Sequence, residues 1–294
     1  LYLRGLYLYR RRGAGLADAR ALFEQAIARD PGFARAHAAL ASTLLTTPYF
    51  LPVRMAAVLP PARAAAERAL GLADSLADAH AAMGYVLAES FDWPRAEAEY
   101  RRAIALDPAG AEPLYRLGNL LVATGRADEA IPVLESLRDR DPLYSVAASF
   151  LAASYAWVGR EADALAEGRR ALALEPNGLP QLWILSVIYD WAGQRDSAAA
   201  LARRKLTLTR APARIGLAAM ILADAGDRAA AEAVARQIEA TPPGLFGREA
   251  GLMHAYLGLG DTARALDAME RAAAGDGDLL YTSITSLFLV GEMQ

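Results

Sequence analysis

Apolar residues recur at helical spacing along most of the chain, in Ala-rich segments that glycine and proline interrupt at regular intervals. The interruptions share a period of 34 residues. Acid–proline pairs mark this period at Asp107-Pro108, Asp141-Pro142 and Glu175-Pro176. Glycines follow the same period, with the fourth arriving one residue early: Gly125, Gly159, Gly193, Gly226 and Gly260.

The residue types at these positions predict a repeated helix pair. Glycine permits a tight turn between two helices, whereas proline cannot continue the second helix and restricts the residue before it to extended backbone. Small alanines at fixed positions, such as Ala130 and Ala164, let two helix axes approach closely. The pattern therefore predicts an all-α chain of about eight helix pairs over residues 1–275.

These segments resemble the tetratricopeptide repeat (TPR), in which a Trp-x2-Leu-Gly-x2-Tyr pattern is followed by Ala-x3-Phe and then by Pro. The clearest matches are the copies that contain Met83-Gly84 and Leu117-Gly118. The resemblance implies a right-handed α-solenoid. Its repeats are expected at about residues 1–31, 33–74, 77–108, 111–142, 145–176, 179–210, 212–243 and 246–275.

A narrower resemblance concerns the context of the repeats. Residues 1–5, 69–80 and 91–96 are similar to the repeat arrays of large bacterial regulators, in which the array follows a winged-helix, Ser/Thr kinase or adenylate cyclase domain. The match departs at Asp74, where that family usually has proline. Because the chain begins at Leu1 without methionine, we expect a fragment of such a regulator. Its expected location is cytoplasmic, or periplasmic if a membrane span precedes it.

Two segments depart from the repeat pattern. Residues 46–61 contain four prolines, which predicts a loop with at most a short helical turn. Residues 276–294 lose the Ala-rich pattern and become β-like. Within them, Leu279-Leu280-Tyr281-Thr282-Ser283 resembles the translation of a transposon end, so this tail is either a divergent native cap or an artefact.

Composition excludes several functions. The chain carries 31 basic and 34 acidic residues, a net charge of −3, so we expect no direct binding to nucleic acid. No uninterrupted apolar run reaches the roughly 18 residues that a membrane span needs. Cysteine is absent, which removes disulfides, thiolate nucleophiles and Cys-ligated metals. Lys205 is the only lysine.

Catalytic signals are scarce. His37 and His80 share one repeat position, which favours packing over metal binding, and no phosphate-binding loop or nucleophile motif occurs. We therefore predict no catalytic residues, no metal and no cofactor. The predicted function is a noncatalytic protein-interaction scaffold or sensor. The alternatives are the regulatory arm of a larger enzyme, a kinase or cyclase, and a structural oligomerisation module.

The TPR resemblance also implies a binding surface, because the first helix of each repeat lines a concave groove. Aromatic and acidic residues at the groove positions favour a cationic or apolar peptide. The alternative for Trp157, Trp183 and Trp191 is that they pack within their own repeats. The residues expected to line the protein-binding groove are Tyr85, Glu89, Tyr115, Asn119, Ser149, Trp157, Trp183, Asp190, Trp191, Met220, Asp224 and His254.

Overall fold

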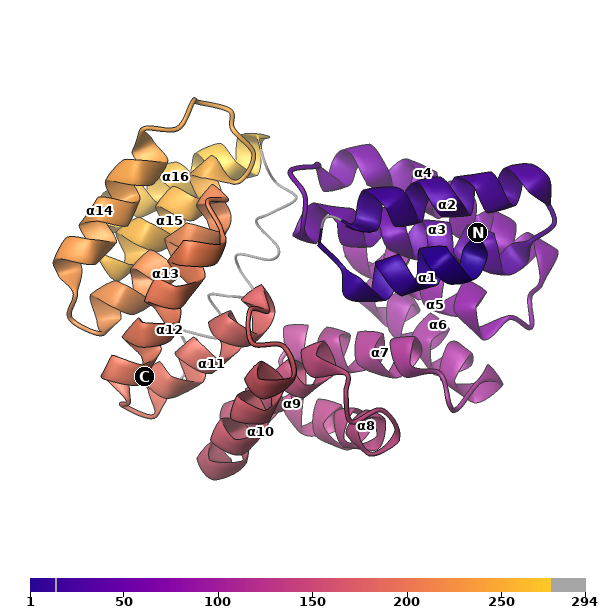
Figure 1. The fold of residues 1–294 in the computed structure, drawn as a ribbon, viewed down its shortest axis with the longest axis horizontal. Helices are drawn as coiled ribbons and strands as arrows, with labels where there is room; N and C mark the ends of the chain where they lie inside the picture. Colours follow the sequence, from indigo (N-terminus) through magenta and orange to yellow (C-terminus); the bar gives the residue numbers. More distant parts are fainter. Residues whose placement is uncertain (14, 276–294) are drawn as a thin grey trace. The chain divides into compact units, whose positions relative to one another are not determined.

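The computed structural model describes residues 1–13 and 15–275, and all the regular secondary structure in these ranges is helical (Figure 1). The predicted all-α fold is therefore confirmed. The described chain divides into two compact units, Leu1–Leu120 and a second unit that begins at Leu121. The first unit holds α1 (Tyr2–Arg11), α2 (Gly15–Arg29), α3 (Ala34–Thr46), a short 3-10 helix (Thr47–Tyr49), α4 (Met55–Leu72), α5 (Ala77–Glu89), α6 (Trp93–Leu106) and most of α7 (Ala111–Ala123).

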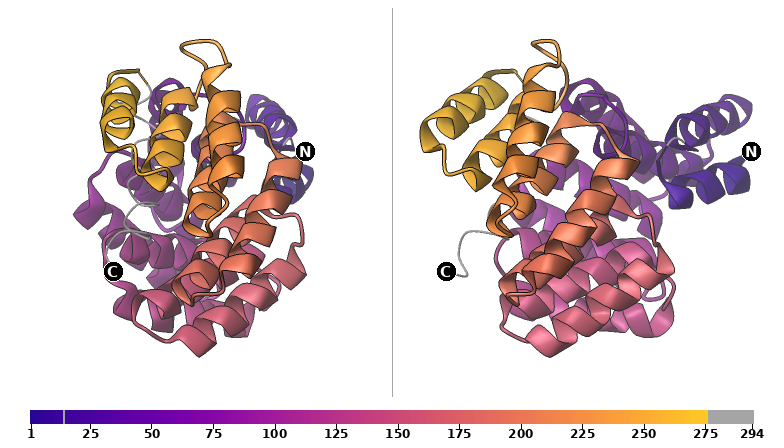
Figure 2. Two further views of the ribbon diagram at one scale, coloured as in Figure 1. Left: turned by 90° about the vertical axis from the view of Figure 1, so that its left-hand side faces the viewer. Right: turned by 60° about the vertical axis from the view of Figure 1, so that its left-hand side comes forward.

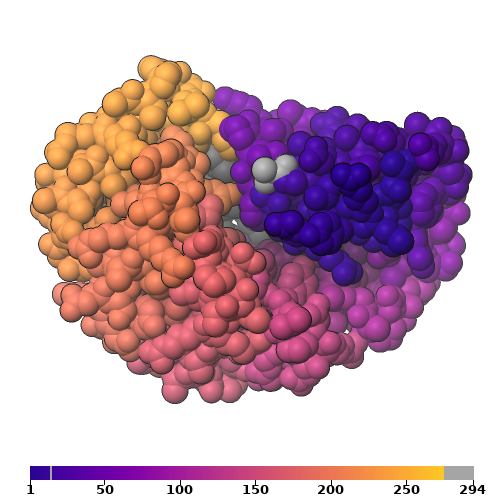
Figure 3. Space-filling model, in the orientation of Figure 1, coloured from indigo at the N-terminus to yellow at the C-terminus, as the bar shows by residue number. Residues whose placement is uncertain are grey.

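The second unit continues the same alternation of helices. It holds α8 (Ala127–Arg140), α9 (Ser145–Trp157), α10 (Glu161–Leu174), α11 (Leu179–Trp191), α12 (Arg195–Leu208), α13 (Pro212–Asp224), α14 (Arg228–Glu239), α15 (Arg248–Gly258) and α16 (Thr262–Gly275). Within each unit, consecutive helices pack against one another (Figure 2). In each unit, side chains fill the gaps that the ribbon leaves between neighbouring helices (Figure 3).

Alanine allows this close stacking. The second helices carry alanine at one repeated position near the turn, where it is almost completely buried: Ala96, Ala130, Ala164, Ala198, Ala231 and Ala265. A larger side chain at any of these positions would separate the helices of the pair. The apolar core of each unit is thus built from many short helix contacts between sequence neighbours.

The predicted turns and stops are confirmed. All five glycines of the 34-residue period adopt a positive φ, between 68° and 89°, which side chains with a Cβ rarely adopt. The residue before each of the three prolines ends its helix in nearly the same conformation, with φ between −137° and −131°. This is the extended backbone that a following proline imposes.

The prediction for residues 46–61 is wrong beyond residue 54. Pro60 and Pro61 lie inside α4, which begins at Met55. Met55 and Val58 are buried, so packing of the first turn holds the helix despite the two missing N–H donors. The φ that proline imposes is itself compatible with a helix. The predicted tail, residues 276–294, lies outside the described residues.

Candidate peptide-binding surface

Two of the predicted groove residues, Trp183 and Trp191, line one apolar hollow in the second unit. Both belong to α11, and their spacing of eight residues returns them to the same helix face. The other lining residues are Ala153 of α9 and Ile184, Val187 and Ile188 of α11. The hollow therefore lies where α9 and α11 pack together.

Two carboxylates lie at the C-terminal ends of neighbouring first helices. Asp190 is close to the end of α11, and Asp224 is the last residue of α13. Burial raises the pKa of Asp190, while Arg195 opposes the shift. Burial and the charge of Asp190 raise the pKa of Asp224 to about 6, again against Arg195. The structure therefore brings these two acids close enough to repel each other.

We call Trp157, Trp183, Asp190, Trp191 and Asp224 the tryptophan surface. Trp157 is the last residue of α9, and it, Asp190, Trp191 and Asp224 are half-buried, so part of each side chain can meet a ligand. Trp183 is only 8% exposed and forms the floor. An aromatic floor beside partly desolvated carboxylates is suited to a side chain that carries a positive charge.

Three other predicted residues of this unit are buried among helices. The Ser149 hydroxyl donates to the Ser145 carbonyl at 3.2 Å, and a ring nitrogen of His254 lies 2.7 Å from the Ala250 carbonyl oxygen. Met220 packs against α15, where a Cβ added at Gly258 would lie 2.6 Å from the Met220 Cα. These contacts lie within the helix stack and hold the three side chains there.

In the first unit, two of the predicted groove residues, Tyr85 and Glu89, make internal polar contacts. Tyr85 is buried, and its hydroxyl donates to the Leu45 carbonyl at 3.0 Å. Tyr49 donates to Glu89 at 2.7 Å. Tyr115 is buried and Asn119 is half-buried, both on α7.

Arg116, which was not among the predicted residues, is central to a polar network. Its guanidinium lies 3.5 Å from the centre of the Tyr85 ring and donates to Glu112 at 3.0 Å. It also donates to the hydroxyls of Tyr9 and Thr46, each at 3.3 Å. Burial alone would lower the pKa of Arg116, but Tyr85 and Glu112 raise it, so this buried cation stays charged. Arginine does not recur at this position in the other repeats, so the 34-residue period gives no indication that Arg116 is buried.

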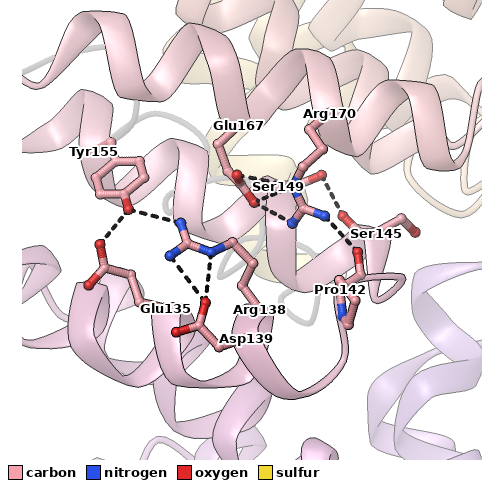
Figure 4. A network of polar contacts seen from close by, with 9 residues as sticks. All are labelled: Glu135, Arg138, Asp139, Pro142, Ser145, Ser149, Tyr155, Glu167 and Arg170. Atoms are coloured by element: carbon pink, nitrogen blue, oxygen red, sulfur yellow. Dashed lines mark hydrogen bonds and ion pairs between the residues drawn. The ribbon is translucent and has the colours of Figure 1, made fainter.

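A further polar network, around α8, α9 and α10, is structural. Tyr155 of α9 donates to Glu135 of α8 at 2.6 Å and accepts a bond from Arg138 (Figure 4). Arg170 of α10 pairs with the buried Glu167 and donates to the Pro142 carbonyl at 2.6 Å (Figure 4). The contact between Tyr155 and Glu135 recurs three repeats later. There Tyr256 of α15 donates to Glu239 of α14 at 2.5 Å, so the motif braces one repeat against the next.

The two histidines that share one repeat position, His37 and His80, make local contacts. His80 lies 2.6 Å from Glu99 and 2.7 Å from the Asp74 carbonyl oxygen, and His37 lies 3.1 Å from the Pro31 carbonyl oxygen. Across residues 1–13 and 15–275, no three His, Cys, Asp or Glu side chains come together in a way that could hold a metal ion. Among the helices of these ranges, none has the length and hydropathy needed to cross a bilayer.

A second, more open hollow lies among α10, α11 and α12. Leucines and Tyr189 line it, and Arg169 and Arg204 stand at its rim. Arg169 donates to the Tyr189 hydroxyl at 3.0 Å and Arg204 to Asn177 at 3.2 Å. Arg169 thus bridges α10 and α11, and Arg204 bridges α12 and the connection between α10 and α11.

The stacked helices define a helical-repeat protein. Residues 87–153 match the family model described as "Tetratricopeptide repeat", so this segment carries TPR repeats. None of the curated proteins matches the chain.

Solved structures extend the likeness over nearly the whole chain. The chain resembles the crystal structure of the APC/C hetero-tetramer Cut9-Hcn1 with a TM-score of 0.64 and 12% identity, over 94% of this chain and 52% of that one. It resembles yeast Tom70 with a TM-score of 0.59 and 16% identity, over 98% and 63% of the two chains. For Pseudomonas aeruginosa pilF the TM-score is 0.53 and the identity 18%, over 86% and 97%. These similarities establish the fold, an all-α solenoid of TPR-like helix pairs.

Proposed function

We propose that the chain is a noncatalytic protein-interaction scaffold whose second unit binds a peptide on the tryptophan surface. The observation that supports this most directly is the apolar hollow shared by Trp183 and Trp191, with Asp190 and Asp224 at neighbouring helix ends. Tryptophan is enriched among the residues that dominate binding energy at protein interfaces.

The chemistry of this surface selects the ligand. Asp190 and Asp224 repel each other, and a cationic group between them would relieve that repulsion and lower both pKa values. The ring faces and the aliphatic side chains of α11 form a shallow apolar surface against which an apolar group next to it would pack. The partner proposed is therefore a peptide that carries arginine or lysine beside an apolar residue.

The regulatory context remains part of the proposal. Residues 1–5, 69–80 and 91–96 support a place in a bacterial regulator, in which the repeats would sense or dock a partner. The same arrangement would also serve the regulatory arm of a kinase or cyclase, or an oligomerisation module. These alternatives differ in whether the second unit binds a separate peptide.

The test begins with a random heptapeptide library displayed on phage and panned against the full chain. Peptides enriched in a basic residue beside an apolar one are expected. Their affinity is then measured by fluorescence anisotropy with the wild type and with Trp191→Ala. Loss of an anchoring tryptophan reduces the binding free energy by about 2 kcal/mol, so the dissociation constant should rise roughly thirtyfold.

The matched control is Trp93→Ala, since Trp93 is a partly exposed tryptophan at the start of α6, in the first unit. This variant should bind the selected peptides as the wild type does. Circular dichroism checks that both variants keep their helicity. Equal affinities for wild type and Trp191→Ala, or a library that yields no enriched peptide, would contradict the proposal.

A further inference from the structure

Lys205 occupies a position that the other repeats give to apolar residues. It lies on α12, and the residues at the same repeat position are all fully buried: Ala69, Ala103, Leu137, Ala171, Ile238 and Ala272. Lys205 is itself only 2% exposed. The sole lysine of the chain thus places an ammonium group where the repeat otherwise needs only packing.

Among the described residues, no anion lies near enough to this ammonium to raise its pKa. Its Nζ lies 5.0 Å from the centre of the Trp183 ring, and within the described part of the chain no hydrogen bond or ion pair is formed by Nζ. Burial, and then the nearby positive charge of Arg214 on α13, lower the pKa of Lys205 to about 7. Buried lysines are almost always paired, so a cation held in this way can accept an external negative charge.

We propose that Lys205, beside the ring of Trp183, receives an acidic side chain of the peptide that binds the tryptophan surface. This inference rests on the proposed function. It makes the surface bipolar, with a cationic end at Lys205 and an acidic end at Asp190 and Asp224. The partner is then a peptide that carries one acidic and one basic residue. The acidic residue would lie at Lys205 and the basic residue at Asp190 and Asp224.

The helix geometry sets the spacing of the two charges. Trp183, over which the ammonium lies, and Asp190 are seven residues apart on α11, which corresponds to about 10 Å at 1.5 Å per residue. An extended peptide advances about 3.3 Å per residue. The acidic and basic residues of the partner should therefore be about three positions apart, with apolar residues between them over the hollow.

Binding should also move a proton. At pH 8 the Lys205 amine is largely neutral and Asp224 is charged, because their pKa values are about 7 and about 6. Of the elements that pack against Lys205, α11 presents the uncharged Trp183, and α13 presents Arg214. A carboxylate bound beside Nζ would favour the ammonium form, so the complex should take up protons at pH 8.

The experiment repeats the library panning with Lys205→Met, and with Arg204→Met as the control on the exposed face of the same helix. Methionine restores the apolar character of this repeat position, so Lys205→Met should fold at least as stably as the wild type. Wild type and Arg204→Met should select an acidic and a basic residue three positions apart. Lys205→Met should select the basic residue alone.

Affinities and proton uptake then test the contact directly. Replacing the selected acid by its amide should weaken binding to the wild type about tenfold or more, and binding to Lys205→Met less than twofold. Calorimetry at pH 8, in buffers of different ionisation enthalpy, should show proton uptake with the wild type and none with Lys205→Met.

Failure of this inference and failure of the proposed function give different results. Basic, apolar peptides without a preferred acid, selected equally by wild type and Lys205→Met, would overturn the role of Lys205 and leave the peptide surface standing. The absence of any enriched peptide would overturn both.

Discussion

Gly216 and Gly251 bring α13 and α15 into direct backbone contact. A Cβ placed on Gly216 would lie 2.6 Å from the Gly251 Cα and would also strike its carbonyl oxygen, and a Cβ on Gly251 would lie 2.6 Å from the Pro212 carbonyl carbon. Backbone atoms cannot move aside as the end of a flexible side chain can. The two first helices of the last repeats therefore depend on the absence of side chains at these positions.

We expect Gly251→Ala to destabilise the chain by about 1 to 3 kcal/mol, the usual cost of overpacking. Urea unfolding followed by circular dichroism measures the change. The control is Gly71→Ala on α4, where an added Cβ meets no atom within 4 Å. That variant should gain about 0.5 to 1 kcal/mol, since alanine is the better helix former. A neutral Gly251→Ala would show that α13 and α15 are not in backbone contact.

Phe91 occupies the turn position that glycine holds in five later repeats, and its φ is 61°. Its ring is 57% exposed and packs edge-on against Trp93, so little burial compensates the strain. Phe91→Gly should be more stable than Phe91→Ala by about 1 kcal/mol, because alanine keeps the strained backbone. Thermal unfolding compares the two, and Gly193→Ala, at φ 68°, should lose stability for the same reason. Equal midpoints for the glycine and alanine variants would contradict this explanation.

Arg116 should be essential to the first unit. Arg116→Met removes the buried one of the two arginines paired with the Glu112 carboxylate, the other being Arg12, and it removes the guanidinium that donates to the Tyr9 hydroxyl. Breaking a buried pair typically costs about 3 to 5 kcal/mol. Arg101→Met removes an exposed pair with Glu97 and should cost about 1 kcal/mol or less. Similar losses in the two variants, measured by urea unfolding, would show that the Arg116 network contributes little.

Stability should depend on pH through Lys205. Between pH 7 and about 10 the unfolded chain holds the proton on this amine, whereas the folded chain, with a pKa of about 7, releases it. Because the unfolded state binds more protons in this window, the free energy of unfolding should rise with pH. The difference in melting temperature between Lys205→Met and the wild type should therefore shrink from pH 7 to pH 10. A constant difference would mean that the buried amine keeps an ordinary pKa.

The sequence predicts the helices well where short-range chemistry decides them. Glycines of the 34-residue period and the acid–proline pairs specify turns and stops through their own backbone preferences. The prediction fails at Pro60 and Pro61, because the burial of Met55 and Val58 outweighs local propensity. At Phe91 the 34-residue period predicts where the turn lies. It does not predict that a residue other than glycine adopts the positive φ there.

The candidate site is predictable only in part, for a related reason. Helical spacing alone places Trp183 and Trp191 on one face, and both line the same hollow. The burial of Tyr85 and Tyr115 involves Arg116, which is held by Tyr9, more than 100 residues away in the sequence. Periodicity carries no information about such a contact. Lys205 could have been found, since it is the one charged residue at an otherwise apolar repeat position.

Hydrogen exchange of the full chain, with and without a saturating library-selected peptide, tests the central claim most directly. We expect slower exchange in α11 and α13, strongest toward Trp191 and Asp224, and unchanged exchange in α1 to α6. Protection confined to residues 1–120, with none in α11 or α13, would contradict a binding surface in the second unit.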